Sequence, residues 1–285
     1  MAILKKSLTN LILWGCLLAS VNSFAEDLFR EVPESDRQEI IKYFQKRFAR
    51  ETLEEYSNGA LMLDEDAMQQ FKSIMEFPPF EDQIELGRKI WHTKFTNGKY
   101  FSDCLENQGK GAAALYPQFD IKTNKVITFE MAVNQCLLDN GESEFSYSDT
   151  KTMGALTAYA RKLSDGFPMK VLVKNSQAFK KYLQGKKLYF ERMGQLNLAC
   201  ASCHITYAGY YFRDEKLSPA LGQATHFPVF RGGEFLFTLQ MRYRRCMEAM
   251  RATPLPAGSE ELNNLEYFHS FLSNGLSLEA SVYRK

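Results

Sequence analysis

The sequence shows no excess of either charge. Its 285 residues include 35 Lys and Arg against 34 Asp and Glu. A protein that coats nucleic acid usually carries a strong basic excess, so we expect no nucleic acid partner. The balance is compatible with a small anionic substrate, because one local basic cluster is enough to bind it. Hydrophobic residues make up 45% of the chain, which excludes a disordered chain and suffices for about two domains of roughly 150 residues.

Beyond its amino terminus the chain also lacks a long apolar segment. Residues 11–21 form an apolar stretch of 11 residues, which follows Lys5 and Lys6 and precedes a small-x-small sequence at residues 23–25. This order is typical of a secretory signal peptide, and the stretch is shorter than a membrane span. We therefore predict a signal peptide over residues 1–25, with a retained anchor as the alternative. The mature chain is expected to be exported and to have no membrane span.

The cysteine count is odd once the signal peptide is removed. The six cysteines are Cys16, Cys104, Cys136, Cys200, Cys203 and Cys246. Cys16 lies in the predicted signal peptide, where a faint match to a lipid-attachment box is a further alternative. The other five leave one thiol without a disulfide partner in an oxidising compartment.

The segment Cys200-Ala201-Ser202-Cys203-His204 has the spacing of a c-type haem attachment site. Two thiols at i and i+3 lie on one side of a turn and add to the vinyl groups of the haem. The histidine that follows reaches the iron as its proximal ligand. The alternatives are a redox dithiol, which lacks the usual strand context, and half of a zinc site, which lacks a second ligand pair nearby. We therefore predict one covalently attached haem c.

Cys104 and Cys136 are the natural candidates for a disulfide bond. The bond would close a loop of 33 residues, a constraint that contributes roughly 3–4 kcal/mol in the chain-entropy model. Spacing alone does not establish it. Cys246 is then the thiol without a partner, and four arginines lie within five residues of it. Cations near a thiol stabilise the thiolate, the form that attacks electrophiles and binds metals.

His204 fills only one axial position of a haem iron. Cys246 is the strongest candidate for the second axial ligand, because a thiolate is a strong electron donor that gives the iron a low reduction potential. Such a potential suits a sulfur that itself reacts. The competing candidates are Met241, Met247, Met250 and His226. The alternative role for Cys246 is that of a small buried residue on a helix.

The arginines near Cys246 divide by helix face. Arg242 lies four residues before Cys246, so on a helix the two side chains share one face. Arg244 and Arg245 project away from that face, toward a partner or the haem propionates. The remaining histidines, His92 and His269, show no spacing signal and are expected to be structural.

Hydrophobic residues spaced three and four apart predict a mainly α fold. The expected helices cover residues 36–49, 87–95, 128–138, 148–163, 176–193, 234–250 and 259–272. Residues 96–125 and 205–234 are expected to be mostly loop. A break at residues 164–168 marks a domain boundary, which gives domains over residues 26–165 and 166–285.

The chain resembles the SoxA family, the catalytic subunits of the SoxAX cytochrome complex in periplasmic sulfur oxidation. The segments that carry the resemblance are Asn197–His204, Leu217-Ser218-Pro219, Phe227–Arg231, Arg242–Cys246, Leu265-Glu266-Tyr267 and, upstream, Cys104, Gly109-Lys110-Gly111 and Cys136. The CxxCH motif alone indicates only a cytochrome c, whereas its combination with a late Arg-rich cysteine is far more specific.

The resemblance implies two cytochrome c-like domains and a SoxX-like cytochrome as the bound partner. It implies that Cys200 and Cys203 tether the haem, that His204 and Cys246 ligate the iron, and that Cys246 is the catalytic sulfur. Arg242 matches the family's substrate-binding arginine. The implied activity is that of an L-cysteine S-thiosulfotransferase, which joins thiosulfate oxidatively to a cysteine of a SoxYZ-like carrier.

The sequence departs from the two-haem members of that family, because it has no first CxxCH motif. The segment Phe101–Leu105 occupies that neighbourhood with neither the first cysteine nor the histidine. We therefore expect an amino-terminal domain without haem, held by Cys104 and Cys136. Two other functions stay open. One is a thiosulfate dehydrogenase that releases tetrathionate, and the other is an electron-transfer cytochrome in which Cys246 is structural.

Overall fold

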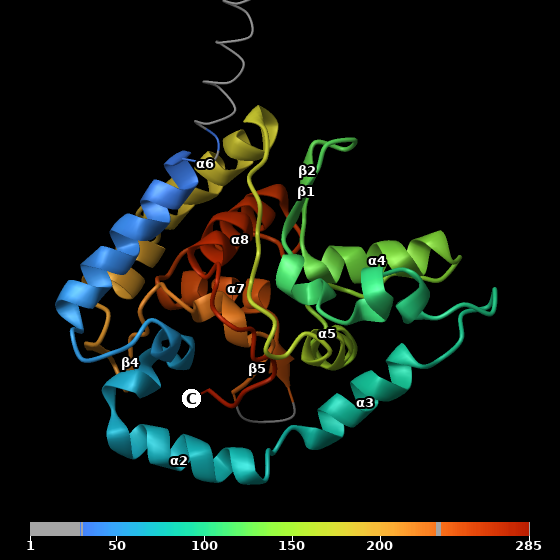
Figure 1. Cartoon of the computed structure of the whole chain (residues 1–285), viewed down its shortest axis with the longest axis horizontal. Coiled ribbons are helices and arrows are strands. Elements are labelled where there is room, and N and C mark those ends of the chain that lie inside the picture. The colour runs from blue at the N-terminus through green and yellow to red at the C-terminus, as the bar shows by residue number, and fades with distance from the viewer. Residues whose placement is uncertain (1–28, 30, 232–234, 285) are drawn as a thin grey trace, which may run out of the picture.

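The computed structural model describes residues 29, 31–231 and 235–284, and the predicted signal peptide lies outside them. The described chain is mainly helical, as the hydrophobic spacing predicts (Figure 1). None of its described helices is long and apolar enough to cross a membrane.

The described part contains α-helices, shorter helical turns and three two-stranded antiparallel ladders. The α-helices are the helix over residues 31–47, α2 (Glu65–Glu76), α3 (Glu81–Trp91), α4 (Phe129–Asp139), α5 (Thr152–Lys162), α6 (Ser176–Phe190), α7 (Leu239–Ala249) and α8 (Glu260–Leu272). The short turns are η1 (Glu54–Leu63), η2 (Phe101–Asp103), η3 (Glu106–Gly109), η4 (Ala112–Leu115), η5 (Ser202–Thr206) and η6 (Gln223–His226). The ladders pair β1 (Gln118–Asp120) with β2 (Lys125–Ile127), β3 (Tyr211–Phe212) with β4 (Glu215–Lys216), and β5 (Val229–Phe230) with β6 (Leu236–Phe237).

Capping side chains set helix ends that hydrophobic spacing does not show. The carboxylate of Asp149 accepts a hydrogen bond from the N–H of Thr152 at 3.0 Å, so α5 begins at Thr152 and the expected start at Ser148 is wrong. Thr238 caps α7, which is therefore shorter than the expected helix over 234–250. Helix α2 was not among the expected helices, although Asp64 caps it and its apolar residues Met68, Phe71, Ile74 and Met75 are spaced three and four apart.

The two halves of the described chain repeat one order of elements. A helix (α3 or α6) is followed by a short turn (η4 or η6), a ladder (β1–β2 or β5–β6) and two helices (α4 and α5, or α7 and α8). Gly111 and Gly222 precede the turns with φ angles of 76° and 75°, which favour glycine. Pro117 and Pro228 follow six residues after those glycines.

The repeat places two cysteines at matching positions. Thr128 caps α4 and Thr238 caps α7, and Cys136 and Cys246 each lie eight residues further along. In the first half Cys136 forms a disulfide bond with Cys104. The position that holds a free thiol in the second half therefore holds a cross-link in the first.

In both halves the first helix packs against the last through a glycine. A Cβ atom on Gly87 of α3 would lie 2.0 Å from the carbonyl oxygen of Ala155 on α5. A Cβ atom on Gly185 of α6 would lie 1.8 Å from the carbonyl oxygen of Asn264 on α8. No side chain fits at such distances, so each glycine permits direct contact between two backbones.

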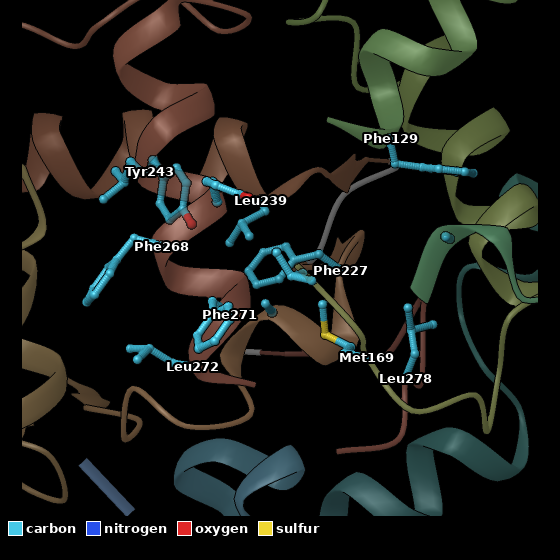
Figure 2. Close-up of a cluster of buried hydrophobic side chains, with 14 of the residues drawn as sticks. Phe129, Met169, Phe227, Leu239, Tyr243, Phe268, Phe271, Leu272 and Leu278 are labelled. Atoms are coloured by element: carbon cyan, nitrogen blue, oxygen red, sulfur yellow. The ribbon is translucent and has the colours of Figure 1, made fainter. Parts of the chain in front are cut away.

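One hydrophobic core connects the two halves. It includes Phe129 of α4 together with Met169, Phe227 and Phe268, and Figure 2 shows part of this cluster. The connecting segment pairs with the carboxy-terminal segment, since the N–H of Met169 donates to the carbonyl of Leu276 at 3.0 Å. The break expected at residues 164–168 is thus an ordered connection.

The helix over residues 31–47 contacts the second half of the chain. Asp36 accepts hydrogen bonds from Tyr182 at 3.0 Å and from Lys186 at 2.6 Å, both on α6, and Figure 1 shows this helix alongside α6. The division into domains 26–165 and 166–285 stays a proposal, supported by the internal repeat.

Gly185→Ala should destabilise the protein by about 2 kcal/mol, because the new methyl group would force α6 away from α8. The matched control is Lys180→Ala on the exposed side of the same helix, which should leave the free energy of unfolding within about 0.5 kcal/mol. Urea unfolding followed by circular dichroism measures both. Equal stability of the two variants would contradict the packing described above.

Candidate functional site

A cavity of about 490 Å³ brings the predicted site residues together. Its walls include Cys200, Cys203, His204, Arg242 and Cys246. They come from the segment after α6 and from α7, which are about 40 residues apart in the sequence. The volume lies in the range of cofactor pockets.

The backbone around the CxxCH segment sets the tautomer of His204. Its Nδ1 atom lies 2.9 Å from the carbonyl oxygen of Ser218. Only a protonated Nδ1 can donate to a carbonyl, so Nε2 keeps the lone pair that a metal ligand needs. Burial lowers the pKa of His204 to about 4, so the ring is neutral at physiological pH.

The two cysteines of the motif are uncharged as free thiols. Burial raises the pKa of Cys200 to about 12, and the neighbouring Cys246 adds to the effect. Burial also raises the pKa of Cys203. The cavity wall can therefore hold both sulfur atoms without the cost of a buried charge.

Two further side chains connect His204 to α7. Gln223 Nε2 lies 2.9 Å from His204 Nδ1, and Gln223 Oε1 lies 3.0 Å from His269 Nε2. The Nδ1 atom of His269 lies 2.8 Å from the hydroxyl of Tyr243. His269 is buried in this chain of contacts. Because Nδ1 of His204 donates to the Ser218 carbonyl, it cannot also accept from the Gln223 amide, so the Ser218 carbonyl orients the ring of His204.

Arg47 fastens the helix over residues 31–47 to the segment that follows His204. Its guanidinium donates to the carbonyls of Ile205 at 2.9 Å, Thr206 at 2.8 Å and Ala208 at 2.6 Å. These carbonyls lie at and just beyond the end of η5, where backbone carbonyl groups have no N–H donor within the helix. This contact could not be predicted from local sequence patterns, because 158 residues separate Arg47 from Ile205.

Helix α7 presents Arg242 and Cys246 to the cavity, as their spacing predicts. Cys246 is half-buried and forms no disulfide bond. Arg244 donates to the carbonyl of Leu255 at 2.8 Å, and Arg245 pairs with Glu248 at 2.9 Å. Neither Arg244 nor Arg245 is among the residues that line the cavity.

A second arginine reaches the cavity from the loop before α7. Arg231 and Arg242 both form ion pairs with the carboxylate of Glu215. Burial and the charge of Arg242 lower the pKa of Arg231, whereas Glu215 and Cys246 oppose the shift. The analysis of the cysteine neighbourhood missed Arg231 and Glu215, although Arg231 ends one of the segments that carry the family resemblance.

Three of the four competing axial ligands share the cavity with Cys246. Met247, Met250 and His226 line it, whereas Met241 is buried outside its lining. His226 lies in the wall rather than in solvent, and its Nδ1 atom has no partner among the described residues. The described residues contain no cluster of three or more His, Cys, Asp or Glu side chains arranged to bind a metal ion directly.

These residues fit a c-type haem. Two thiols spaced for thioether bonds lie in the wall of a partly apolar cavity, next to a neutral histidine with a free Nε2 atom. Cys246 supplies a further sulfur in the same cavity. This donor set of imidazole and sulfur is typical of haem iron.

The fold and the site together define a protein of the cytochrome c class. The family model described as SoxA/TsdA, cytochrome c domain, matches residues 86–169. That match covers the half that contains the disulfide bond and no CxxCH motif.

The chain belongs to the SoxA family. It is 39% identical over 263 residues to the L-cysteine S-thiosulfotransferase subunit SoxA of Chlorobaculum tepidum, which covers 92% of this chain and 91% of that one. The subunit of the same name from Allochromatium vinosum is 37% identical, over 89% of this chain and 90% of that one. The crystal structure of SoxXA from P. pantotrophus matches with a TM-score of 0.69 and 27% identity, over 76% of this chain and 84% of that one.

A buried carboxyl group on α8 helps to hold α7 in place. Gln240 of α7 donates to Glu266 at 3.0 Å and to Asn263 at 2.8 Å. Burial raises the pKa of Glu266, and the nearby Glu130 raises it further. The folded protein therefore keeps a proton on Glu266 at pH values where the unfolded chain has lost it.

The stability that this proton contributes is fully present below the ordinary carboxyl pKa and is lost as pH rises through the higher pKa of the folded state. Glu266→Gln is neutral at every pH and keeps the hydrogen bond. We expect the melting temperature of the unmodified protein to fall more between about pH 5 and about pH 8 than that of the variant. The control is Glu261→Gln, on an exposed position of the same helix. A parallel fall in all three proteins would contradict the role of Glu266.

Proposed function

We propose that this chain is the SoxA subunit of a periplasmic L-cysteine S-thiosulfotransferase. It joins thiosulfate oxidatively to a cysteine of a SoxYZ-like carrier and works with a SoxX-like cytochrome. The observation that carries this proposal is the common cavity of Cys246 and Arg242 with the CxxCH residues. The names of the relatives, and the SoxXA complex as structural neighbour, support it.

The chain carries one haem c in this proposal. Cys200 and Cys203 would hold it by thioether bonds, His204 would supply Nε2, and Cys246 would be the second ligand. The haem would supply one-electron redox chemistry. The first half would carry none, because it has no CxxCH motif and its matching cysteine, Cys136, is in a disulfide bond.

The arginines give the site its affinity for a sulfur oxyanion. Thiosulfate is a dianion, and guanidinium groups bind such ions through paired charge-assisted hydrogen bonds. Arg242 lies one helical turn from Cys246, so an anion held there has its outer sulfur near the Cys246 sulfur. This arrangement favours covalent catalysis by Cys246.

Removal of two electrons joins the Cys246 thiolate to the outer sulfur of thiosulfate by a new S–S bond, and the electrons pass to the cytochrome complex. The thiolate of the carrier then attacks that outer sulfur and takes over the S–SO₃ group. The bond to Cys246 breaks and its thiolate returns, while the proton of the carrier thiol goes to solvent.

Cys246→Ala should lower the conjugating activity at least about a hundredfold, because it removes the sulfur that bonds to the substrate. The assay incubates the complex with thiosulfate and the carrier, and mass spectrometry detects the carrier adduct. Haem content, from the pyridine haemochrome spectrum, should be unchanged. Full activity in the variant would instead indicate an electron-transfer cytochrome. Abundant free tetrathionate in the absence of carrier would indicate a thiosulfate dehydrogenase.

Arg242→Ala should lower kcat/KM for thiosulfate roughly tenfold to a hundredfold, because one charged partner of the anion is lost. The matched control is Arg245→Ala on the same helix, whose guanidinium pairs with Glu248 outside the cavity. The control should stay within about twofold. Equal kinetics for both variants would remove the binding role of Arg242.

A further inference from the structure

The carboxylate of Glu215 lies between the two arginines of the cavity. Its Oε2 atom accepts from Nη2 of Arg242 at 3.1 Å, and its Oε1 atom contacts Nη2 of Arg231. All three side chains line the cavity that contains Cys246. The two carboxylate oxygens thus occupy N–H groups that an incoming oxyanion would need.

A short hairpin delivers Glu215 to this position. Glu215 pairs with Phe212 across β3 and β4, and Arg213 in the turn has a φ angle of 59°. The next residue, Lys216, anchors the hairpin, because its ammonium group binds Asp64 at 2.9 Å and the carbonyl of Leu63 at 3.1 Å. Lys216 therefore anchors the backbone of β4, and the Glu215 carboxylate is held in place by its contacts with Arg231 and Arg242.

Charge explains why a carboxylate is held there. Arg231 and Arg242 are two cations close enough that Arg242 lowers the pKa of Arg231. One carboxylate bound to both reduces their repulsion. The side chain of Glu215 is 41% exposed, whereas those of Arg231 and Arg242 are 19% and 28% exposed. Glu215 is thus the most exposed member of the cluster, and its carboxylate is the group that water can solvate most readily when it leaves the arginines.

We propose that Glu215 is a built-in counter-ion, which holds the oxyanion position between Arg231 and Arg242 until a sulfur oxyanion displaces it. This inference rests on the proposed function of the cavity as a thiosulfate site. A dianion brings more negative charge to the two arginines than one carboxylate does, so the exchange favours the substrate. The carboxylate offsets one of the two positive charges of the site and lowers its affinity for every anion.

The test measures anion binding without catalysis. Sulfate is a dianion that the complex cannot join to a thiol, and isothermal calorimetry on the haem-loaded complex gives its Kd. Glu215→Gln should lower this Kd roughly threefold to tenfold, the range expected when one or two partly exposed ion pairs no longer compete. KM for thiosulfate should fall by a similar factor, with the haem spectrum unchanged.

The matched control is Glu248→Gln, which removes one negative charge from the surface pair on α7. It should change the Kd of sulfate less than twofold. Glu215→Asp keeps the charge but has a shorter reach, so it should also bind sulfate more tightly than the unmodified protein. This second variant decides the question if Glu215→Gln does not fold.

Unchanged or weaker sulfate binding in the folded Glu215 variant would overturn the proposal, since it would show that the carboxylate orients the arginines instead. Absence of sulfate binding in both proteins would overturn it as well. Failure of the proposed function looks different. In that case the unmodified complex forms no carrier adduct, while the calorimetric comparison of the two proteins still reports on Glu215.

Discussion

The close contact between α6 and α8 at Gly185 is the constraint on which the site depends. A carbonyl oxygen would lie 1.8 Å from any Cβ atom at that position. The two backbones are therefore in direct contact, which sets the position of α6 relative to α8 in the second half. The chain leaves α6 toward Cys200 and His204, and α8 supplies Leu265 and His269 to the cavity wall. Helix α7 then closes the cavity with Arg242 and Cys246, held from behind by the contact of Gln240 with Glu266.

The same order of helices, turns and ladders occurs in both halves of the chain, but the cysteine at the matching position is in a disulfide bond in one half and free in the other. In the first half Gly87 and Ala155 make the equivalent backbone contact, and the Cys104–Cys136 disulfide joins the segment before η3 to α4. In the second half the matching cysteine, Cys246, is free and lines a cavity. A covalent cross-link thus stabilises the half that has no haem attachment motif, since it restricts the unfolded chain. Both halves share the glycine contact between their first and last helices and a threonine that caps the helix carrying the cysteine.

Charge at the site comes from the fold rather than from one run of sequence. Of the four arginines near Cys246 in the sequence, only Arg242 lines the cavity, and the helix faces predict this for Arg242, Arg244 and Arg245. Arg244 and Arg245 bond to Leu255 and Glu248 elsewhere. The second cation is Arg231 from a loop, and the carboxylate of Glu215 from a hairpin pairs with both arginines. The cluster therefore has two cations and one anion, a composition that suits the exchange of one anion for another.

Local spacing predicted the CxxCH segment as the haem attachment site, the shared face of Arg242 and Cys246, and a mainly helical chain, and counting cysteines favoured the pairing of Cys104 with Cys136. The structure confirms the disulfide bond, the common cavity of Arg242 and Cys246, and the helices. The sequence alone did not show the start of α5, the hydrogen bonds of Arg47 to the carbonyls after His204, or the meeting of Glu215 with Arg231 and Arg242. Those features depend on capping side chains and on contacts between segments far apart in the sequence, and only the packed helices decide which side chains come within bonding distance.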